Sequence, residues 1–355
     1  MQKLPTQEKT SKVPVDLIRT VAILGVLLLH SANDLTIQVL NDLEIWRWCI
    51  VDVYQSIGRM GVPLFVMLSG ALLLAPSKKS EDLGFFFKKR LSRIGLPFIF
   101  WGIAYFIWNI YVENQPVTIV ESILTGPYFQ FWYLYMLVGL YILTPFLRLL
   151  VAQMTPKLFK YFFIIWFIGV SIVPLISLVT PYKLDVNVFM IPGWVGYFVL
   201  GTYLVNVKVR RLNLALLTTL GIALTAIGTY FMAMTVGGGQ TYYFQEYLSP
   251  TMILASIPFF IILSNSKRSS ESYEPNKHKW TQKLLRLISE NTLPIYLFHM
   301  MVIYILQNGY LGMALNGNTV NSIVGVPLMT ILTLLICLAV IVPLKKVPFL
   351  KRLIG

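Results

Sequence analysis

Long apolar stretches recur along the whole chain, and they restrict its possible folds more than any other feature of the sequence. A helix needs about 20 mostly apolar residues to cross a bilayer, whereas a transmembrane barrel shows segments of about 10 residues with alternating polarity. Only 12% of the 355 residues are charged, too few to cover a globular surface. The sequence therefore predicts an all-α, polytopic transmembrane bundle. The longest apolar stretches are 21–29, 96–107, 162–179, 214–232, 253–263 and 324–344.

The basic residues predict how this bundle is oriented. With the N-terminus in the cytoplasm, every Lys and Arg except Arg47, Arg59 and Lys183 falls on the cytoplasmic side. This distribution agrees with the positive-inside rule at each loop, so both termini are expected in the cytoplasm. We expect about ten spans, at 16–37, 57–75, 94–112, 131–150, 159–180, 190–206, 212–234, 247–264, 288–308 and 323–343.

A single transmembrane domain, 1–355, accounts for the chain, because no stretch between the spans is long enough for a soluble domain. We expect a cytoplasmic tail at 1–15, an outer interfacial segment at 38–56 and a polar cytoplasmic loop at 265–287. The net charge of +14 then faces the cytoplasm and suits anionic lipid headgroups, and nucleic acid is not expected as a partner. The two cysteines and three histidines are too scattered to predict a metal site.

The first expected span contains ionisable residues, which are costly in lipid and mark function by default. Arg19 and His30 are eleven residues apart, close to three helical turns, so they share one helix face about 16 Å apart along the axis. Asp34 follows one turn later, where a carboxylate can orient the imidazole and stabilise its charged form. A His30 that only makes a hydrogen bond in the bundle core fits this span equally well.

Three arginines and a second histidine also lie at unusual positions for a membrane protein. Arg90 and Arg93 lie three residues apart at the cytoplasmic start of the third span and could hold phosphates, although interfacial anchoring is the simpler interpretation. Arg59 is basic on the otherwise acidic outer side. Its first-choice partner is a carboxylate, either Asp34 or Asp52, and the alternative is an anionic acceptor. His299, considered alone, is best explained as a hydrogen-bonded core histidine.

Six short motifs occur in one order on these expected spans, and together they resemble the acyltransferase 3 family of membrane acyltransferases. The chain is most similar to the stand-alone, ten-span sugar O-acetyltransferases of that family, and the resemblance covers nearly all of it. Two positions depart from the family pattern: Ala71 replaces a common aromatic residue, and Gln130 replaces a histidine. The motifs are Arg19 with His30, the block from Arg59 to Gly70, Arg90-Leu-Ser-Arg93, Phe131-Trp132-Tyr133-Leu134 with Tyr141 and Pro145, Gly196 to Gly201, and Ile295 to His299.

The resemblance implies a multi-pass enzyme of a cell membrane, with the cytoplasmic membrane of a prokaryote as the first expectation. It would move an acyl group, expected to be acetyl, from cytoplasmic acyl-CoA to a hydroxyl of a sugar or cell-envelope glycan, which could be lipid-linked. Acetyl-CoA would be the co-substrate, with no metal. His30 would act as general base, oriented by Asp34, or would carry the acyl group covalently. The donor would be bound by Arg19, Arg90 and Arg93, and the acceptor by Arg59, Trp132 and His299.

Two other classes of function stay open from the sequence. A secondary transporter also uses intramembrane His, Asp and Arg residues as a proton relay. The paired halves with Gly- or Pro-interrupted spans that many transporters show are not evident here. A purely structural or sensory membrane protein would leave Arg19 and His30 unexplained. The sequence therefore favours acyl transfer.

Overall fold

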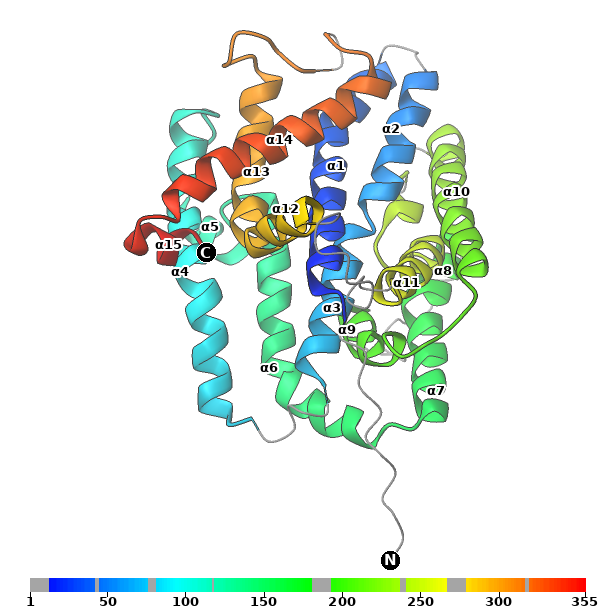
Figure 1. Cartoon of the computed structure of the whole chain (residues 1–355). Coiled ribbons are helices and arrows are strands. Elements are labelled where there is room, and N and C mark those ends of the chain that lie inside the picture. Colours follow the sequence, from blue (N-terminus) through cyan, green and yellow to red (C-terminus); the bar gives the residue numbers. More distant parts are fainter. Residues whose placement is uncertain are drawn as a thin grey trace, which may run out of the picture.

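The computed structural model of the chain contains helices and no strand in the part it describes (Figure 1). That part comprises residues 13–41, 45–75, 81–116, 118–180, 193–236, 241–266, 279–316 and 319–355, without the side chains of 33–41 and 121. The predicted all-α class is therefore confirmed. The helices of the first half are α1 (Val15–Asn41), α2 (Ile45–Gly58), α3 (Gly61–Leu73), α4 (Leu83–Tyr111), α5 (Ile119–Thr125), η2 (Phe129–Phe131), α6 (Trp132–Gln153), α7 (Pro156–Phe167), η3 (Ile168–Ile172) and α8 (Val173–Val179). Those of the second half are α9 (Gly193–Leu204), α10 (Arg211–Thr235), η6 (Tyr243–Gln245), α11 (Pro250–Ser264), α12 (Lys279–Glu290), α13 (Thr292–Gln307), α14 (Ser322–Leu344) and α15 (Pro348–Ile354).

Eight helical stretches within the described residues are long and apolar enough to cross a membrane. They overlap eight of the expected spans, but the second begins at Ile45, inside the predicted interfacial segment 38–56, and the third begins at Leu83. The spans expected at 190–206 and 288–308 contain α9 and α13, which are shorter, with 12 and 16 residues. A multi-pass membrane bundle is thus confirmed, while the number ten and the cytoplasmic termini stay predictions.

Helix α1 lies at the centre of the bundle (Figure 1) and packs against α2, α3, α11, α12, α13 and α14. Its apolar side chains account for this position, because Ile18, Ala22, Ile23 and Leu27 are fully buried. The expected Arg19–His30 face therefore looks into the protein rather than into lipid. We call the end at which α4 and α7 begin (their lower end in Figure 1) the basic end, since it carries Lys88, Arg90, Lys157 and Lys160.

Two glycines allow α3 and α9 to touch backbone to backbone. A Cβ atom added at Gly70 would overlap the Phe198 carbonyl oxygen, and one added at Gly201 would overlap the Met67 carbonyl oxygen. Any side chain at either position would force the helices apart, as overpacking does in closely packed interiors. The glycines of these two family motifs therefore serve helix packing.

The expected segments outside the spans are partly described. Within the predicted interfacial segment 38–56, α2 packs against α1, α10 and α14 and buries Trp48. The predicted tail 1–15 lies, up to residue 12, outside the described residues, as does 267–278 of the predicted loop 265–287. The last part of that loop belongs to α12, which is attached to α1 because Thr20 Oγ1 donates to the Leu285 carbonyl oxygen at 3.1 Å.

Candidate active site

Three arginines gather around Tyr141 toward the basic end of the bundle. Cζ of Arg90 lies 5.9 Å from the centre of the Tyr141 ring, and the guanidinium groups of Arg19 and Arg93 also interact electrostatically with the Tyr141 hydroxyl. Arg19 comes from α1, Arg90 and Arg93 come from α4, and Tyr141 comes from α6. We call these four residues the arginine cluster. It unites all three arginines predicted to bind the donor.

The arginine cluster keeps an excess of positive charge. Arg148 Nη2 lies 2.7 Å from Glu81 Oε2 in a buried ion pair beside the cluster, and Arg148 Nε donates to the Leu73 carbonyl oxygen at 2.8 Å. Asp16 faces Arg19. Among the described residues, four guanidinium groups therefore meet two carboxylates here. Arginines in such a setting bind phosphate groups through charge-assisted, often bidentate hydrogen bonds.

Two histidines meet deep in the bundle, one from α1 and one from α13. The ring centres of His30 and His299 are 5.1 Å apart, with 40° between the ring planes. His299 is fully buried, and its Nδ1 lies 2.6 Å from the Tyr296 carbonyl oxygen. A carbonyl oxygen can only accept, so Nδ1 carries the proton and Nε2 keeps a free lone pair. This Nε2 atom has no hydrogen-bond partner among the described residues.

The His30 ring has two further neighbours. Its centre lies 5.2 Å from that of Phe129 in an edge-to-face arrangement, and the Arg59 guanidinium interacts with it electrostatically. The side chain of Asp34, predicted to orient this imidazole, lies outside the described residues. His299 is the titratable ring that the structure places beside His30, and the sequence did not predict this pairing.

Buried tyrosines connect the arginine cluster with the histidine pair. The Tyr133 hydroxyl interacts electrostatically with Arg19 and with Tyr141. Its ring lies 5.2 Å from that of Tyr296, which lies 5.7 Å from the ring of His299. The face of α1 that carries Arg19 and His30 runs in the same direction as these tyrosines. The two clusters therefore stand at the two ends of one aromatic path through the bundle.

A group of half-buried aromatic rings lies beside the histidine pair. The Trp132 ring is 5.5 Å from Trp194 and 5.6 Å from Tyr247, and Cζ of Arg59 is 5.4 Å from the Tyr247 ring. We call these four residues the aromatic cluster. It combines flat apolar faces with a positive charge, which suits a sugar that carries an anionic group.

The position of Arg59 differs from the one that the sequence suggested. The turn of Arg59 follows Gly58, whose backbone touches Gly25 and Leu29 of α1, so Arg59 lies beside the middle of α1. The suggested partner Asp52 accepts a hydrogen bond from Gln245 Nε2 at 2.5 Å instead. Within the described part of the chain, Arg59 and Asp52 form no ion pair with each other.

These features agree with the comparison of the sequence with known families. A sequence model described as an acyltransferase domain, that of the acyltransferase 3 family, matches residues 14–342. The chain belongs to the acyltransferase 3 family. It is thus a membrane acyltransferase, and the match spans the arginine cluster, the histidine pair and the aromatic cluster. No curated protein and no solved structure matched the chain.

Seven of the eight predicted site residues of this acyltransferase fall into the three clusters, and the eighth is Asp34. Tyr133, Tyr141 and Tyr296 stand in the motifs but were not predicted to belong to the site, although polar groups within spans were the available signal. Trp194 and Tyr247 lie outside the quoted motifs, and no pattern in the sequence marked them as site residues. Among the described residues of the enzyme, no three His, Cys, Asp or Glu side chains are grouped to hold a metal.

Proposed function

We propose that this acyltransferase takes an acyl group, with acetyl as the expected one, from acyl-CoA and transfers it to a hydroxyl of a sugar or cell-envelope glycan. The observation that carries this proposal is the separation of the arginine cluster from the histidine pair along one buried path. Coenzyme A has the same layout, with phosphates at one end and a thioester at the other end of a thin arm. Arg19 and His30 are about 16 Å apart along α1, a distance suited to an extended arm.

The arginine cluster would hold the phosphates of the donor, and the arm would extend past Tyr133 and Tyr296 to the histidine pair. With a cytoplasmic N-terminus, which the basic residues predict, the basic end faces the compartment that contains acyl-CoA. The acceptor would approach the histidines from the aromatic cluster. Such an arrangement lets one active site join a cytoplasmic donor to an acceptor on the other side of the membrane.

In the proposed reaction, His30 takes the proton of the acceptor hydroxyl while the oxygen attacks the thioester carbonyl. The C–S bond then breaks, and the leaving thiolate takes that proton from the His30 imidazolium. The free Nε2 of His299 lies on the neighbouring ring and would accept a hydrogen bond from the imidazolium, which stabilises its charge. This role makes His299 a positioning residue, and Asp34 and His299 are alternative acceptors for the one N–H of His30 that does not exchange the reacting proton. A covalent acyl-histidine on His30 is the alternative course of the same transfer.

The test compares His30→Ala with Ser31→Ala in purified enzyme that is given acetyl-CoA and candidate sugars. Ser31 is the adjacent residue of α1, and its buried hydroxyl makes no hydrogen bond among the described residues. We expect the wild type and Ser31→Ala to release coenzyme A and add one acetyl mass increment to the sugar. His30→Ala should bind acetyl-CoA without transfer, and a His30→Ala variant that transfers at the wild-type rate would refute the proposed chemistry.

The acceptor can be identified by the loss of one acetyl group in the cell. A strain that lacks the gene, compared by mass spectrometry of its glycans with the parent, should lack one acetyl increment on a specific glycan. Restoring the wild-type gene should restore that increment, whereas the His30→Ala gene should not. Glycans with unchanged acetylation in the deletion strain would argue against a glycan acceptor.

A further inference from the structure

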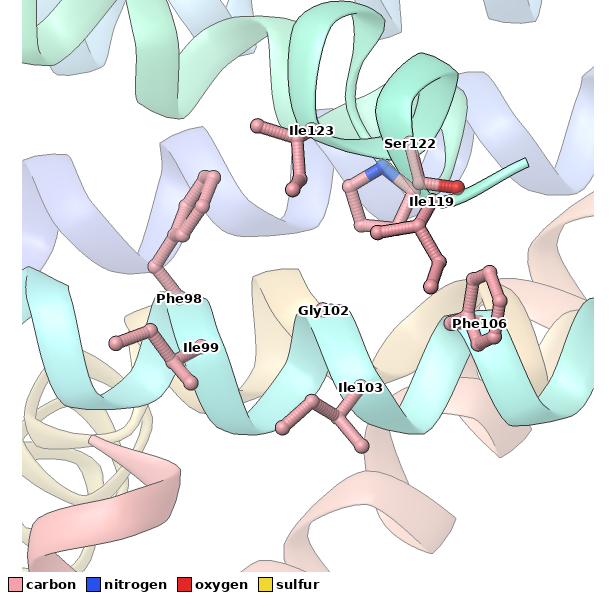
Figure 2. A pocket seen from close by; sticks show the side chains of 9 residues that line it. Phe98, Ile99, Gly102, Ile103, Phe106, Ile119, Ser122 and Ile123 are labelled. Carbon is pink, nitrogen blue, oxygen red and sulfur yellow. The ribbon is translucent and has the colours of Figure 1, made fainter. Parts of the chain in front are cut away.

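An apolar groove runs between α4 and α5 (Figure 2). It has a volume of about 410 Å³, within the range typical of ligand sites. Figure 2 shows Gly102 on the side of α4 that faces α5, with Phe98 and Phe106 on either side of it. Ile119 and Ile123 of α5 close the groove from above. The missing side chain of Gly102 therefore deepens its floor.

The side chains that line the groove favour the binding of a hydrocarbon chain. Ser122 supplies its one polar side chain, and the other lining side chains are apolar. Ile99, Ile103, Ile119 and Ile123 are all exposed at its edges. Because α4 is a candidate membrane span, we expect the exposed Ile99 and Ile103 to face lipid and the groove to open sideways to the bilayer. A chain from the membrane can enter it without crossing water.

The inner wall of the groove is also a wall of the active site. Pro127 lines the groove, and Phe129, two residues later, contacts His30. The carbonyl oxygen of Gln130 accepts a hydrogen bond from the Tyr296 hydroxyl at 2.6 Å, next to His299. The segment 127–131 therefore has the groove on one side and the histidine pair on the other.

This wall is held in place by buried contacts. Asn109 Nδ2 donates to the Pro127 carbonyl oxygen at 2.8 Å, and the Phe98 ring lies 5.6 Å from that of Phe131. Gly126 adopts a positive φ of 98°, a conformation that glycine adopts without strain. An occupant of the groove is thereby kept at a defined place relative to His30.

We propose that the groove holds the hydrocarbon chain of a lipid-carried acceptor, so that the sugar at the end of the chain reaches the histidine pair. This inference rests on the proposed function and specifies its acceptor. A lipid carrier joins chain and sugar through phosphate, and the guanidinium group of Arg59 supplies a positive charge near His30.

The test fills the groove without disturbing the fold. A Cβ at Gly102 would meet only Pro127 Cγ, at 3.8 Å, so Gly102→Leu extends into the groove and places a better helix former in α4. Gly95→Leu is the matched control, because Gly95 lies two turns away on the same side of α4 and a Cβ there meets nothing within 4 Å. Ile123→Phe fills the groove independently from α5.

The measurement is photolabelling in lipid nanodiscs with a long-chain prenyl phosphate that carries a diazirine in its chain. We expect labelled peptides from α4 and α5 in the wild type and in Gly95→Leu. Labelling should fall at least tenfold in Gly102→Leu and Ile123→Phe, or when unlabelled prenyl phosphate is added. Equal labelling of all variants, or equally strong labelling of α4 and α5 by a diazirine phospholipid, would overturn the proposal in favour of bulk lipid.

The same measurement separates this inference from the proposed function. Photolabelling needs no acetyl-CoA and no transfer, so His30→Ala should be labelled like the wild type. Failure of the groove proposal would thus appear as unchanged labelling in Gly102→Leu, even if His30→Ala proves inactive. Failure of the proposed function would appear as transfer by His30→Ala, whatever the labelling shows.

Discussion

His299 offers a substitution that separates its structural hydrogen bond from its proposed role in the reaction. In His299→Asn, the side-chain amide can still donate to the Tyr296 carbonyl oxygen, as Nδ1 does at 2.6 Å in the wild type. The shorter side chain has no counterpart of Nε2, which is buried and free of hydrogen bonds among the described residues. The variant should therefore fold normally and lack the acceptor beside His30.

The magnitude follows from the charge that His30 acquires in the proposed reaction. The His30 and His299 rings are 5.1 Å apart, so Nε2 can bond to the imidazolium with little movement. Hydrogen bonds to charged groups contribute about 1.5–3 kcal/mol. Since about 1.4 kcal/mol changes a rate tenfold, His299→Asn should lower kcat by about 10- to 150-fold. His299→Ala should lose the Nδ1 hydrogen bond as well, which costs about 1 kcal/mol of stability.

The assay measures the initial rate of coenzyme A release, acetyl-CoA affinity and melting temperature for each variant. We expect His299→Asn to keep the affinity and melting temperature of the wild type and to lose turnover. His299→Gln, whose amide reaches the place of Nε2, should recover part of the rate. If His299→Asn turns over at the wild-type rate while His30→Ala is inactive, His299 is a structural residue and the reasoning is wrong.

The other predictions concern charged side chains. Arg90→Ala and Arg93→Ala should each weaken acetyl-CoA binding, and more strongly at low salt, because high salt already screens contacts with phosphate; unchanged affinity in both would leave interfacial anchoring as their role. Arg59→Gln should keep the melting temperature and acetyl-CoA affinity but raise the acceptor KM or lower turnover, and a clear loss of thermal stability would instead indicate a structural partner. Glu81→Ala leaves a buried arginine without its ion-pair partner and should destabilise the enzyme by about 3–5 kcal/mol, measured by thermal unfolding. Glu290→Ala, which breaks an exposed pair screened by solvent, should leave the melting temperature nearly unchanged, and equal losses in the two variants would contradict this expectation.

The sequence by itself determined the helical class, most of the spans and the relation between Arg19 and His30. Lipid offers no partner to backbone groups, so a long apolar stretch has to be helical. Eleven residues are close to three helical turns, so two side chains with this spacing share a face in any α-helix. The motifs also predicted that the arginines of α4 belong to the site, and they indicated the family. All of these are local properties, readable from one stretch of chain at a time.

Local patterns could not distinguish residues whose roles depend on distant partners. Arg148 looks like any basic residue at the basic end, yet it is buried and paired with Glu81. Arg59 stands at the expected edge of a span, but the contact of Gly58 with α1 places it beside the middle of that helix. In both cases the deciding contact comes from a distant part of the chain.

The tertiary structure alone decided how the site is assembled. His30 and His299 come from opposite ends of the sequence, and they meet because α13 packs against α1. The groove arises because α5, a seven-residue helix outside every expected span, lies against α4. Periodicity describes which face of a helix is apolar but not which helix covers that face. The pairing is decided by the packing of all helices together, so the active site and its opening to the membrane became visible only in the folded chain.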